Sequence, residues 1–385
     1  MMSASEVYVL EAMRTPIVRK NGKFRSIRPE ILGAEVLRAL IARCDILHAD
    51  GVIAGNAVGT GGNLARLMAL EARLPAEVPA VTIDMQCASG AAALDYAYAR
   101  IASGQDDLLL AGGMESASLQ PLRIYDEKDE RRGAMPDGAY RTAQFSPGEL
   151  AEDAMIRGAE RVAQAEHVTK AELDEWTLRS HRLATKARAV GLLHDRIVPV
   201  AAANGWREDD GIREKLSQQL LDRLPLLFGA GSLTTAGNSC LVHDGAAFAV
   251  LASGRYVYSH GMRPVARILG VAMAGGDPRE SPRGAMRTAD LLLRRMHLDY
   301  GDLAAIEFNE AFAVIDVLFA REHPDLLDRY CRYGGALAYG HPYGASGGIL
   351  LVHLLTALRE VGGGMGLLSI AGAGGMGEAI LVEAV

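Results

Sequence analysis

The sequence predicts an α/β protein made of two similar halves, with a mostly helical region inserted between them. Three observations lead to this prediction. The chain has 385 residues, is 49% hydrophobic and contains 43 glycines. Strand-like and helix-like segments alternate near both ends, and one short glycine-containing pattern occurs twice. A chain of this length exceeds one ordinary core, and its composition favours many tight turns between packed elements.

The first half contains a strand–helix–strand unit. Residues 5–12 alternate like a strand, and residues 31–44 have the apolar spacing of a helix. A further strand is predicted over residues 78–86, an alanine-rich helix over 90–104 and a buried strand over 106–115. A strand, a helix and a strand in this order predict a parallel crossover.

The repeated pattern is Ala-Ser-Gly followed, after a helix and a strand, by Gly-Gly-Met. Its first copy occupies residues 88–90 and 112–114, and its second copy occupies residues 345–347 and 374–376. Two signals in the same order, separated by similar secondary structure, predict duplicated halves.

The region between the halves has a different composition. Residues 123–144 are charged and punctuated by glycine, which predicts a loop. Its charge run, from Asp126 to Arg132, is expected to form a solvated surface. The Thr-Lys-Ala-Glu segment at 169–172 has the pattern of a helix capping box. We predict the following divisions of the chain: 1–117 with 244–264 as the first half, 118–243 as a loop domain, and 265–385 as the second half.

Composition also excludes several classes of protein. The formal net charge of -7 argues against nucleic acid as the main partner. The four cysteines have no paired spacing, which argues against a zinc site or a disulfide framework and favours a reducing compartment. No signal peptide is predicted at the start, and no apolar run reaches the roughly 20 residues of a membrane helix. We therefore expect a cytoplasmic protein without metal, membrane or nucleic acid partners.

Cys87 is the first candidate for chemistry, because it stands where a strand turns into a helix. A lone cysteine beside alanines is commonly a small buried hydrophobe. A helix N-terminus, however, lowers a thiol pKa, and the small residues 88–90 leave the turn open to a substrate. A nucleophile needs a base. His341 is the candidate base, because equivalent turns of two similar halves meet near one axis; the alternative is a loop histidine satisfied by backbone groups.

Two further motifs contain candidate residues. Asn309 follows an apolar strand-like run and precedes a helix, where it is an N-cap, holds a water or orients a catalytic group. Residues 372–377 satisfy G-x-G-x-x-G, but only eight residues follow them, which leaves no room for a dinucleotide-binding unit.

Five motifs together resemble the thiolase family over essentially the whole chain: CASGAAA, AGGMES, NEAFA, GGALAYGHPYGASG and GAGGMGEA. The resemblance implies two five-layered α-β-α-β-α halves with an inserted loop domain. It implies that Cys87 is the nucleophile, that His341 activates it, and that Asn309 holds a water at an oxyanion site. The implied reaction is acyl transfer from an acyl-CoA to the cysteine, and then to a second acyl-CoA or to free CoA.

The resemblance also implies partners. Coenzyme A is expected as substrate or product, with no bound cofactor and no metal, and the chain is expected to form a homodimer or homotetramer. Residues 234–247 resemble the segment that lines the pantetheine arm. Contacts with CoA are implied for the following residues: Arg213, Phe228, Ala236, Cys240, Ala311 and Phe312.

One departure from the family concerns the second step. The second cysteine, which deprotonates the second substrate, is replaced here by Ala371. Alanine cannot move a proton, so Cys240 is either a relocated acid/base or a packing residue beside pantetheine. Two alternatives to the thiolase reaction stay open: transfer of the acyl group to a non-carbon acceptor, and a non-catalytic CoA-binding scaffold. Retention of Cys87, His341 and Asn309 argues against the scaffold.

Overall fold

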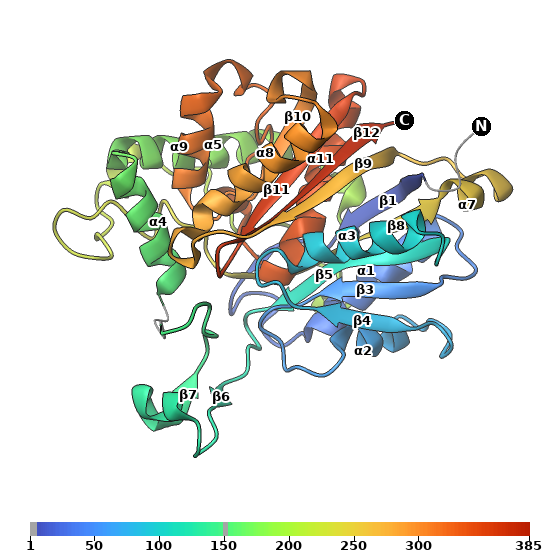
Figure 1. The fold of residues 1–385 in the computed structure, drawn as a ribbon, viewed down its shortest axis with the longest axis horizontal. Coiled ribbons are helices and arrows are strands. Elements are labelled where there is room, and N and C mark those ends of the chain that lie inside the picture. The colour runs from blue at the N-terminus through green and yellow to red at the C-terminus, as the bar shows by residue number, and fades with distance from the viewer. Residues whose placement is uncertain (1–5, 149–152) are drawn as a thin grey trace.

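A central sheet organises the computed structural model, which describes residues 6–148 and 153–385. Its ten strands in this described part of the chain are β1 (Val7–Arg14), β2 (Val18–Arg19), β3 (Gly51–Gly55), β4 (Ala80–Ile83), β5 (Leu108–Ser116), β8 (His243–Ser253), β9 (Ala266–Ala274), β10 (Leu303–Phe308), β11 (Met365–Gly372) and β12 (Met376–Ala384). They run in the order β10-β11-β12-β9-β1-β8-β5-β3-β4, with β2 beside β8 (Figure 1).

The two halves of this sheet follow one plan. In the first half β3 is parallel to β5, β5 is antiparallel to β8, and β8 is antiparallel to β1. In the second half β10 is parallel to β11, β11 is antiparallel to β12, and β12 is antiparallel to β9. A short antiparallel pairing of β1 with β9 joins them. The duplication predicted from the repeated pattern is confirmed.

The predicted parallel crossover contains an additional strand. The strands predicted over 78–86 and 106–115 are β4 and β5, but β3 lies between them and is parallel to both. Neither β3 nor the helix α2 (Leu64–Glu71) was predicted. Both are short, and a five-residue strand of small and apolar residues bounded by glycine carries little periodicity.

The helices complete five layers around the two half-sheets. The six helices of these layers are α1 (Pro29–Arg43), α2, α3 (Ser89–Ala102), α8 (Gly284–Met296), α9 (Ala313–Glu322) and α11 (Ser346–Val361). Helices α1 and α2 cover the outer face of the first half-sheet, and α8 covers the outer face of the second. Helices α3 and α11 pack against each other between the sheets (Figure 1). The five-layered fold is therefore confirmed.

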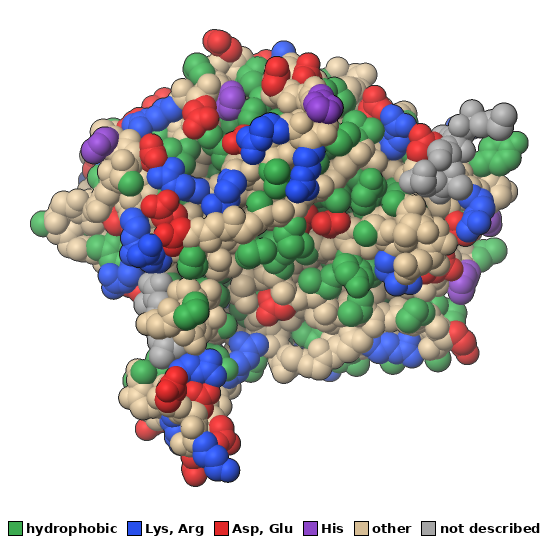
Figure 2. Space-filling view, viewed as in Figure 1, with side chains coloured by type: hydrophobic (Ala, Val, Ile, Leu, Met, Phe, Trp, Pro, Cys, Tyr) green, Lys and Arg blue, Asp and Glu red, His purple; other side chains and the backbone are tan. Residues whose placement is uncertain are grey.

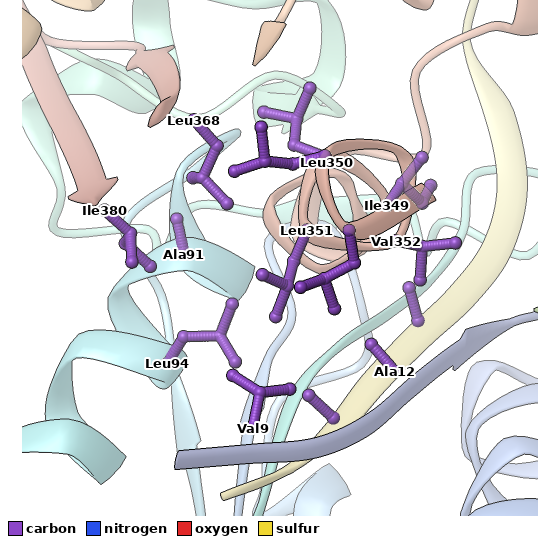
Figure 3. Packing of buried hydrophobic residues seen from close by; sticks show 14 of the residues in the cluster. Val9, Ala12, Ala91, Leu94, Ile349, Leu350, Leu351, Val352, Leu368 and Ile380 are labelled. Carbon is purple, nitrogen blue, oxygen red and sulfur yellow. The ribbon is translucent and has the colours of Figure 1, made fainter. Parts of the chain in front are cut away.

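The central layer forms one core. Figure 3 shows Leu94 of α3 and Leu351 of α11 pointing toward each other, with Val9 of β1 beside them and Ile380 of β12 nearby. Fully burying a leucine or isoleucine side chain contributes about 1.5–3 kcal/mol. This packing fixes both helices, and it therefore fixes the turns that precede their N-termini.

The segment Tyr343–Val361 has the length and apolar composition of a membrane-spanning helix. The sequence predicts no apolar run of roughly 20 residues, but the helical segment begins at Tyr343 and is therefore longer than its apolar run. In the fold, 83% of its most apolar window is buried. A helix that is apolar on all sides suits the layer between two sheets, which accounts for this composition.

The region between β5 and β8 combines helices and irregular segments. It contains α4 (Ala154–Ala165), α5 (Lys170–Ala189), α6 (Gln218–Leu221) and a hairpin of β6 (Arg123–Ile124) with β7 (Ala139–Tyr140). Helix α5 begins with the predicted capping box. The hairpin and its flanks, residues 120–142, form an arm that projects from the body (Figure 1). Figure 2 shows side chains of both charges gathered on this arm. Two short helices complete the fold: α7 (Gly254–Ser259) and α10 (Ala336–Tyr339).

Candidate active site

A cavity of about 200 Å³ lies where the two halves and the inserted region meet. Its wall includes two residues predicted as catalytic, Cys87 and His341, and three predicted CoA contacts, Cys240, Ala311 and Phe312. The structure therefore brings together side chains from both repeated turns and from the segment that resembles the pantetheine lining.

A tight turn presents Cys87 to this cavity. Gln86 has a left-handed φ of 52°, and its backbone N–H donates to Asp84 Oδ1 at 2.9 Å. Ser89 Oγ donates to the Gln86 carbonyl at 2.6 Å and accepts from the Met85 N–H at 2.8 Å. The left-handed residue and these bonds reverse the chain sharply after β4, so that the thiol lies directly before α3.

The environment of Cys87 favours the neutral thiol. Burial raises the pKa of Cys87 to about 12, although the backbone amides of Cys87 and Ala373 favour the thiolate. The expected lowering of this pKa by the helix N-terminus is therefore wrong. The cause is desolvation, which penalises the charged form more than nearby dipoles stabilise it. A base must accept the proton as the sulfur attacks.

His341 has the properties of such a base. Its backbone N–H donates to the Leu241 carbonyl at 3.0 Å, which fixes the residue against the segment before β8. Its Nδ1 lies 2.6 Å from Ser346 Oγ, and its Nε2 is buried with no hydrogen-bond partner among the described residues. Burial lowers the pKa of His341 to about 3, so the ring is neutral. When Nδ1 donates to Ser346, the Nε2 lone pair is free to accept a proton.

The two Ala-Ser-Gly turns are in direct contact. A Cβ atom on Gly90 would lie 2.5 Å from the Gly344 carbonyl oxygen, and one on Gly113 would lie 1.9 Å from it. A Cβ atom on Gly347 would lie 2.1 Å from the Ala91 nitrogen. Only residues without a side chain permit this approach. Glycine thus allows the turns of the two halves to meet behind the cavity.

Asn309, the third residue predicted as catalytic, is buried and is not among the residues that line the cavity. Helix α9 begins at Ala313 and has Phe312 at its N-cap, so the N-cap alternative for Asn309 is wrong. The Asn309 N–H donates to the Ser369 carbonyl at 3.0 Å. Its side-chain Nδ2 is buried and has no partner among the described residues. The side-chain amide therefore has an unused donor within the described part of the chain, as a role in holding a water requires.

The position of the missing second cysteine lies on the same cavity wall as Cys87, Cys240 and Tyr343. Ala371 lines the cavity. Burial, and then the charge of Cys87, raise the pKa of the Cys240 thiol, which shows that the two sulfurs are near each other. Tyr343 was not singled out from the sequence, although it follows His341-Pro342 directly. Its ring packs edge-on to the His341 ring with centroids 5.2 Å apart, and burial raises its pKa with smaller contributions from both cysteines.

The other predicted CoA contacts lie elsewhere. Arg213 and Ala236 line a second cavity, which shares Ser239 with the first. Phe228 lies beneath the Arg157 guanidinium, 4.9 Å from carbon to ring centroid, and belongs to neither wall. The two cavities therefore lie on either side of Ser239 or next to it, and Phe228 lines neither of them.

Two charged residues of the first cavity were not predicted. Arg123 and Arg141, both from the arm, line the same wall as Cys87. Composition predicts a loop for their segment and a solvated surface for its residues 126–132 only, and it indicates no role for these two arginines. These two arginines differ from the other charged residues of the arm in their position. They lie at the base of the hairpin, whereas the others lie toward its tip.

One buried cluster within the described residues has the composition of a metal site: Glu310, Asp316 and Cys331. Burial raises the pKa of all three groups, and the carboxyls already accept hydrogen bonds from Ser180 and Tyr330. Metal ligands must be deprotonated. The cluster therefore suits a protonated, hydrogen-bonded core better than a cation.

Comparison with known families covers nearly the whole chain. Residues 7–255 match the family model for the thiolase N-terminal domain, and residues 262–384 match that for the thiolase C-terminal domain. A β-ketoadipyl-CoA thiolase of Pseudomonas knackmussii is 36% identical, over 99% of both chains. A steroid 3-ketoacyl-CoA thiolase of Mycobacterium tuberculosis is 34% identical, over 98% of this chain and 94% of its own.

Solved structures agree with this assignment. The Bacillus anthracis acetyl-CoA acetyltransferase superimposes with a TM-score of 0.89 at 28% identity, over 99% of both chains. Human mitochondrial 3-ketoacyl-CoA thiolase in complex with CoA superimposes with a TM-score of 0.89 at 27% identity, over 100% of this chain and 99% of that one.

Proposed function

The chain belongs to the thiolase family and is a thiolase-type acyltransferase that acts on acyl-CoA, and we propose that Cys87 carries the acyl group. The observation that supports this most is the shared cavity: a thiol and a buried imidazole with a free Nε2 lie on one wall. A nucleophile and a neutral base in one cavity are the minimum for forming an acyl-enzyme.

The first step follows from the two neutral groups. Because burial disfavours both the thiolate and the imidazolium, a preformed ion pair is disfavoured. The proton moves to His341 as Cys87 Sγ bonds to the thioester carbonyl carbon, and it then leaves on the CoA sulfur as the old carbon–sulfur bond breaks. The backbone amides near the thiol, at Cys87 and Ala373, are placed to stabilise the oxyanion.

The second step needs another acid/base, because Ala371 cannot titrate. Cys240 is the candidate, since its thiol lies near Cys87 on the same wall. If Cys240 only packs beside the substrate, the acyl group passes instead to water or to another oxygen, nitrogen or sulfur acceptor. General acid–base help is worth roughly 10²–10⁴-fold, so the two alternatives differ greatly in condensation rate.

Intact-protein mass spectrometry with acetyl-CoA, together with assays of condensation and thiolysis, tests both steps. We expect an acetyl adduct on Cys87 in the native protein and in Cys240→Ala, with condensation and thiolysis lost in Cys240→Ala. Ala371→Cys in the Cys240→Ala background should restore them. Condensation that survives Cys240→Ala contradicts the relocated base, and absence of any adduct on Cys87 contradicts the proposal as a whole.

We also propose that the protein is cytoplasmic and that it assembles as a homodimer or homotetramer through β4. This strand is at the edge of the sheet, and Val81 on it is 43% exposed. Leu67 and Leu70 of α2 and Tyr96 of α3 are exposed large apolar residues of the neighbouring helices. An exposed edge strand with apolar neighbours favours pairing with another chain. Val81→Lys should yield monomers by light scattering, and an unchanged mass contradicts this interface.

A further inference from the structure

We propose that the acyl group transferred at Cys87 ends in a carboxylate, which Arg123 and Arg141 bind. This inference rests on the proposed acyl transfer and adds the chemical class of the substrate. It starts from the charges of the cavity that contains Cys87.

The charge of this cavity is one-sided. Among the described residues of its wall, Arg123 and Arg141 are the charged ones, and no aspartate or glutamate accompanies them. Neither guanidinium forms an ion pair within the described chain, whereas other arginines of the arm do: Arg131 pairs with Asp129 at 2.6 Å. Two positive charges without a counter-charge on a partly enclosed wall attract an anion from outside the chain.

Backbone contacts hold both guanidinium groups at the base of the arm. Arg123 is half-buried, and its Nη2 donates to the Gly59 carbonyl at 2.6 Å. Arg141 Nη1 donates to the Gln120 carbonyl at 3.1 Å, and Gln120 Nε2 donates back to the Arg141 carbonyl at 2.7 Å. A guanidinium has five N–H donors in a planar fork that matches a carboxylate. Each arginine is therefore positioned and still has donors to offer.

The remainder of the wall suits a short carbon chain. Met155, Ile156, Phe312 and Ile315 contribute apolar surface to the same cavity as the thiol and the arginines. A ligand that satisfies such a wall has a thioester for Cys87, methylene groups in the middle and an anionic end. A carboxylate bound to arginine forms charge-assisted, often bidentate hydrogen bonds.

The phosphates of CoA are a second possible source of the anion. The candidate cation for them is Arg213, which lines the adjoining cavity. The wall of that cavity shares Ser239 with the first and includes no residue of the arm. The arm arginines are therefore not needed for the nucleotide end of CoA, which favours the acyl end as their ligand.

The experiment compares acyl-CoA pairs that differ in the charge of the acyl terminus. Succinyl-CoA with butyryl-CoA, glutaryl-CoA with valeryl-CoA, and adipyl-CoA with hexanoyl-CoA have equal numbers of acyl carbons. The rate of acyl-Cys87 formation is measured by rapid quench and mass spectrometry, as kcat/KM for each substrate. In at least one pair, we expect the dicarboxylic member to react on the order of 10-fold to 100-fold faster.

Substitutions in the arm test whether its arginines cause the preference for dicarboxylic substrates. Arg123→Gln with Arg141→Gln should lower the ratio of dicarboxylic to neutral kcat/KM by on the order of 10-fold to 100-fold. Lys128→Gln removes one positive charge from the exposed tip of the same arm, outside the cavity wall, and should leave the ratio unchanged. If the double variant does not fold, Arg141→Gln alone carries the test, because Arg141 is exposed.

N-acetylcysteamine thioesters, which lack the nucleotide, separate the two sources of anion. Persistence of the dicarboxylic preference with them, and its loss in the double variant, supports the acyl terminus as the ligand. The proposal is overturned if no pair shows the preference or if the double variant retains it. It is also overturned if the double variant lowers kcat/KM equally for dicarboxylic and neutral CoA thioesters but does not lower it for N-acetylcysteamine thioesters. Acylation of Cys87 by butyryl-CoA in any of these cases would leave the acyltransferase function intact.

Discussion

The two Ala-Ser-Gly turns share a backbone plan but place their reactive side chains at different offsets. Cys87 directly precedes its Ala-Ser-Gly, whereas His341 stands four residues before the second copy. The counterpart of Cys87 in the second turn is Gly344, and the counterpart of His341 in the first is Asp84. Duplication therefore accounts for two similar turns, each before a helix N-terminus. The chemistry differs because the reactive residue occupies a different position in each copy of the turn.

The surroundings of the two turns differ as well. Helix α3 has an outward face on which Tyr96 is 55% exposed, whereas α11 is buried on all sides until its last turn. Cys87 is correspondingly half-buried, and His341 is only 2% exposed. The thiol turn is thus reached by the substrate, and the imidazole turn is shielded from water. This shielding keeps the base neutral over a wide pH range.

Among variants that test the difference between the two turns, removal of the thiol should have the largest effect. Cys87→Ala should abolish acyl-enzyme formation, because no other cysteine lies at the offset that α3 presents to the cavity. Mass spectrometry after incubation with acetyl-CoA measures this, with Cys44→Ala as the control on a cysteine outside the cavity. An undiminished adduct in Cys87→Ala would place the nucleophile elsewhere, with Cys240 the next residue to test.

Removing the imidazole is the second largest change. His341→Ala should slow acylation by roughly 10²–10⁴-fold, the usual worth of a general base. Ser346→Ala removes only the partner of Nδ1 and should slow acylation by roughly 2-fold to 10-fold, consistent with one hydrogen bond. Rapid-quench kinetics distinguish the two. Equal rates for His341→Ala and the native protein would mean that another group accepts the thiol proton.

The contact between β5 and the second turn can be disturbed without touching either reactive side chain. In Gly113→Ala the new Cβ would lie 1.9 Å from the Gly344 carbonyl oxygen, so the backbone of β5 or of the second turn must move. We expect a loss of about 3 kcal/mol in the free energy of unfolding, together with slower acylation. Gly133→Ala is the matched control, since nothing lies within 4 Å of its Cβ position. Urea unfolding measures both variants, and a neutral Gly113→Ala would show that the approach tolerates a side chain.

Sequence patterns predicted the duplication and the meeting of the turns more reliably than the electrostatics of the site. Repeated glycines are visible in the sequence because a close backbone approach has a specific residue requirement. The pKa of Cys87 was predicted in the wrong direction, because desolvation depends on what encloses the thiol in three dimensions. Tyr343 and the arm arginines were missed for a related reason, since neither a single aromatic in a motif nor a charged loop indicates which cavity it faces.

Glu115, at the end of β5, links the loop after β3 to the second turn and offers the test with the smallest expected effect. Its carboxylate accepts from the Ala57 N–H at 2.9 Å, from Asn56 Nδ2 at 2.8 Å and, in the second turn, from the Gly344 N–H at 3.1 Å. Burial nevertheless raises the pKa of Glu115 to about 7. The folded protein therefore holds this proton more tightly than the unfolded chain, whose carboxyl titrates near its ordinary value of 4.5.

The sign of the pH dependence follows from this difference. The stability that protonated Glu115 contributes is fully present below about pH 4.5 and is lost as the pH rises through about 7, by roughly 3 kcal/mol at most. Glu115→Gln removes the titrating group. It also lowers the free energy of unfolding by an amount that does not depend on pH, because the glutamine NH2 cannot accept the hydrogen bonds that the carboxylate accepts. From pH 5 to pH 8, the free energy of unfolding of the native protein should therefore fall relative to that of Glu115→Gln. Urea titrations at both pH values measure the shift, with the exposed Glu130→Gln as control. Parallel pH profiles for all three proteins would show that Glu115 keeps its ordinary pKa beside the second turn.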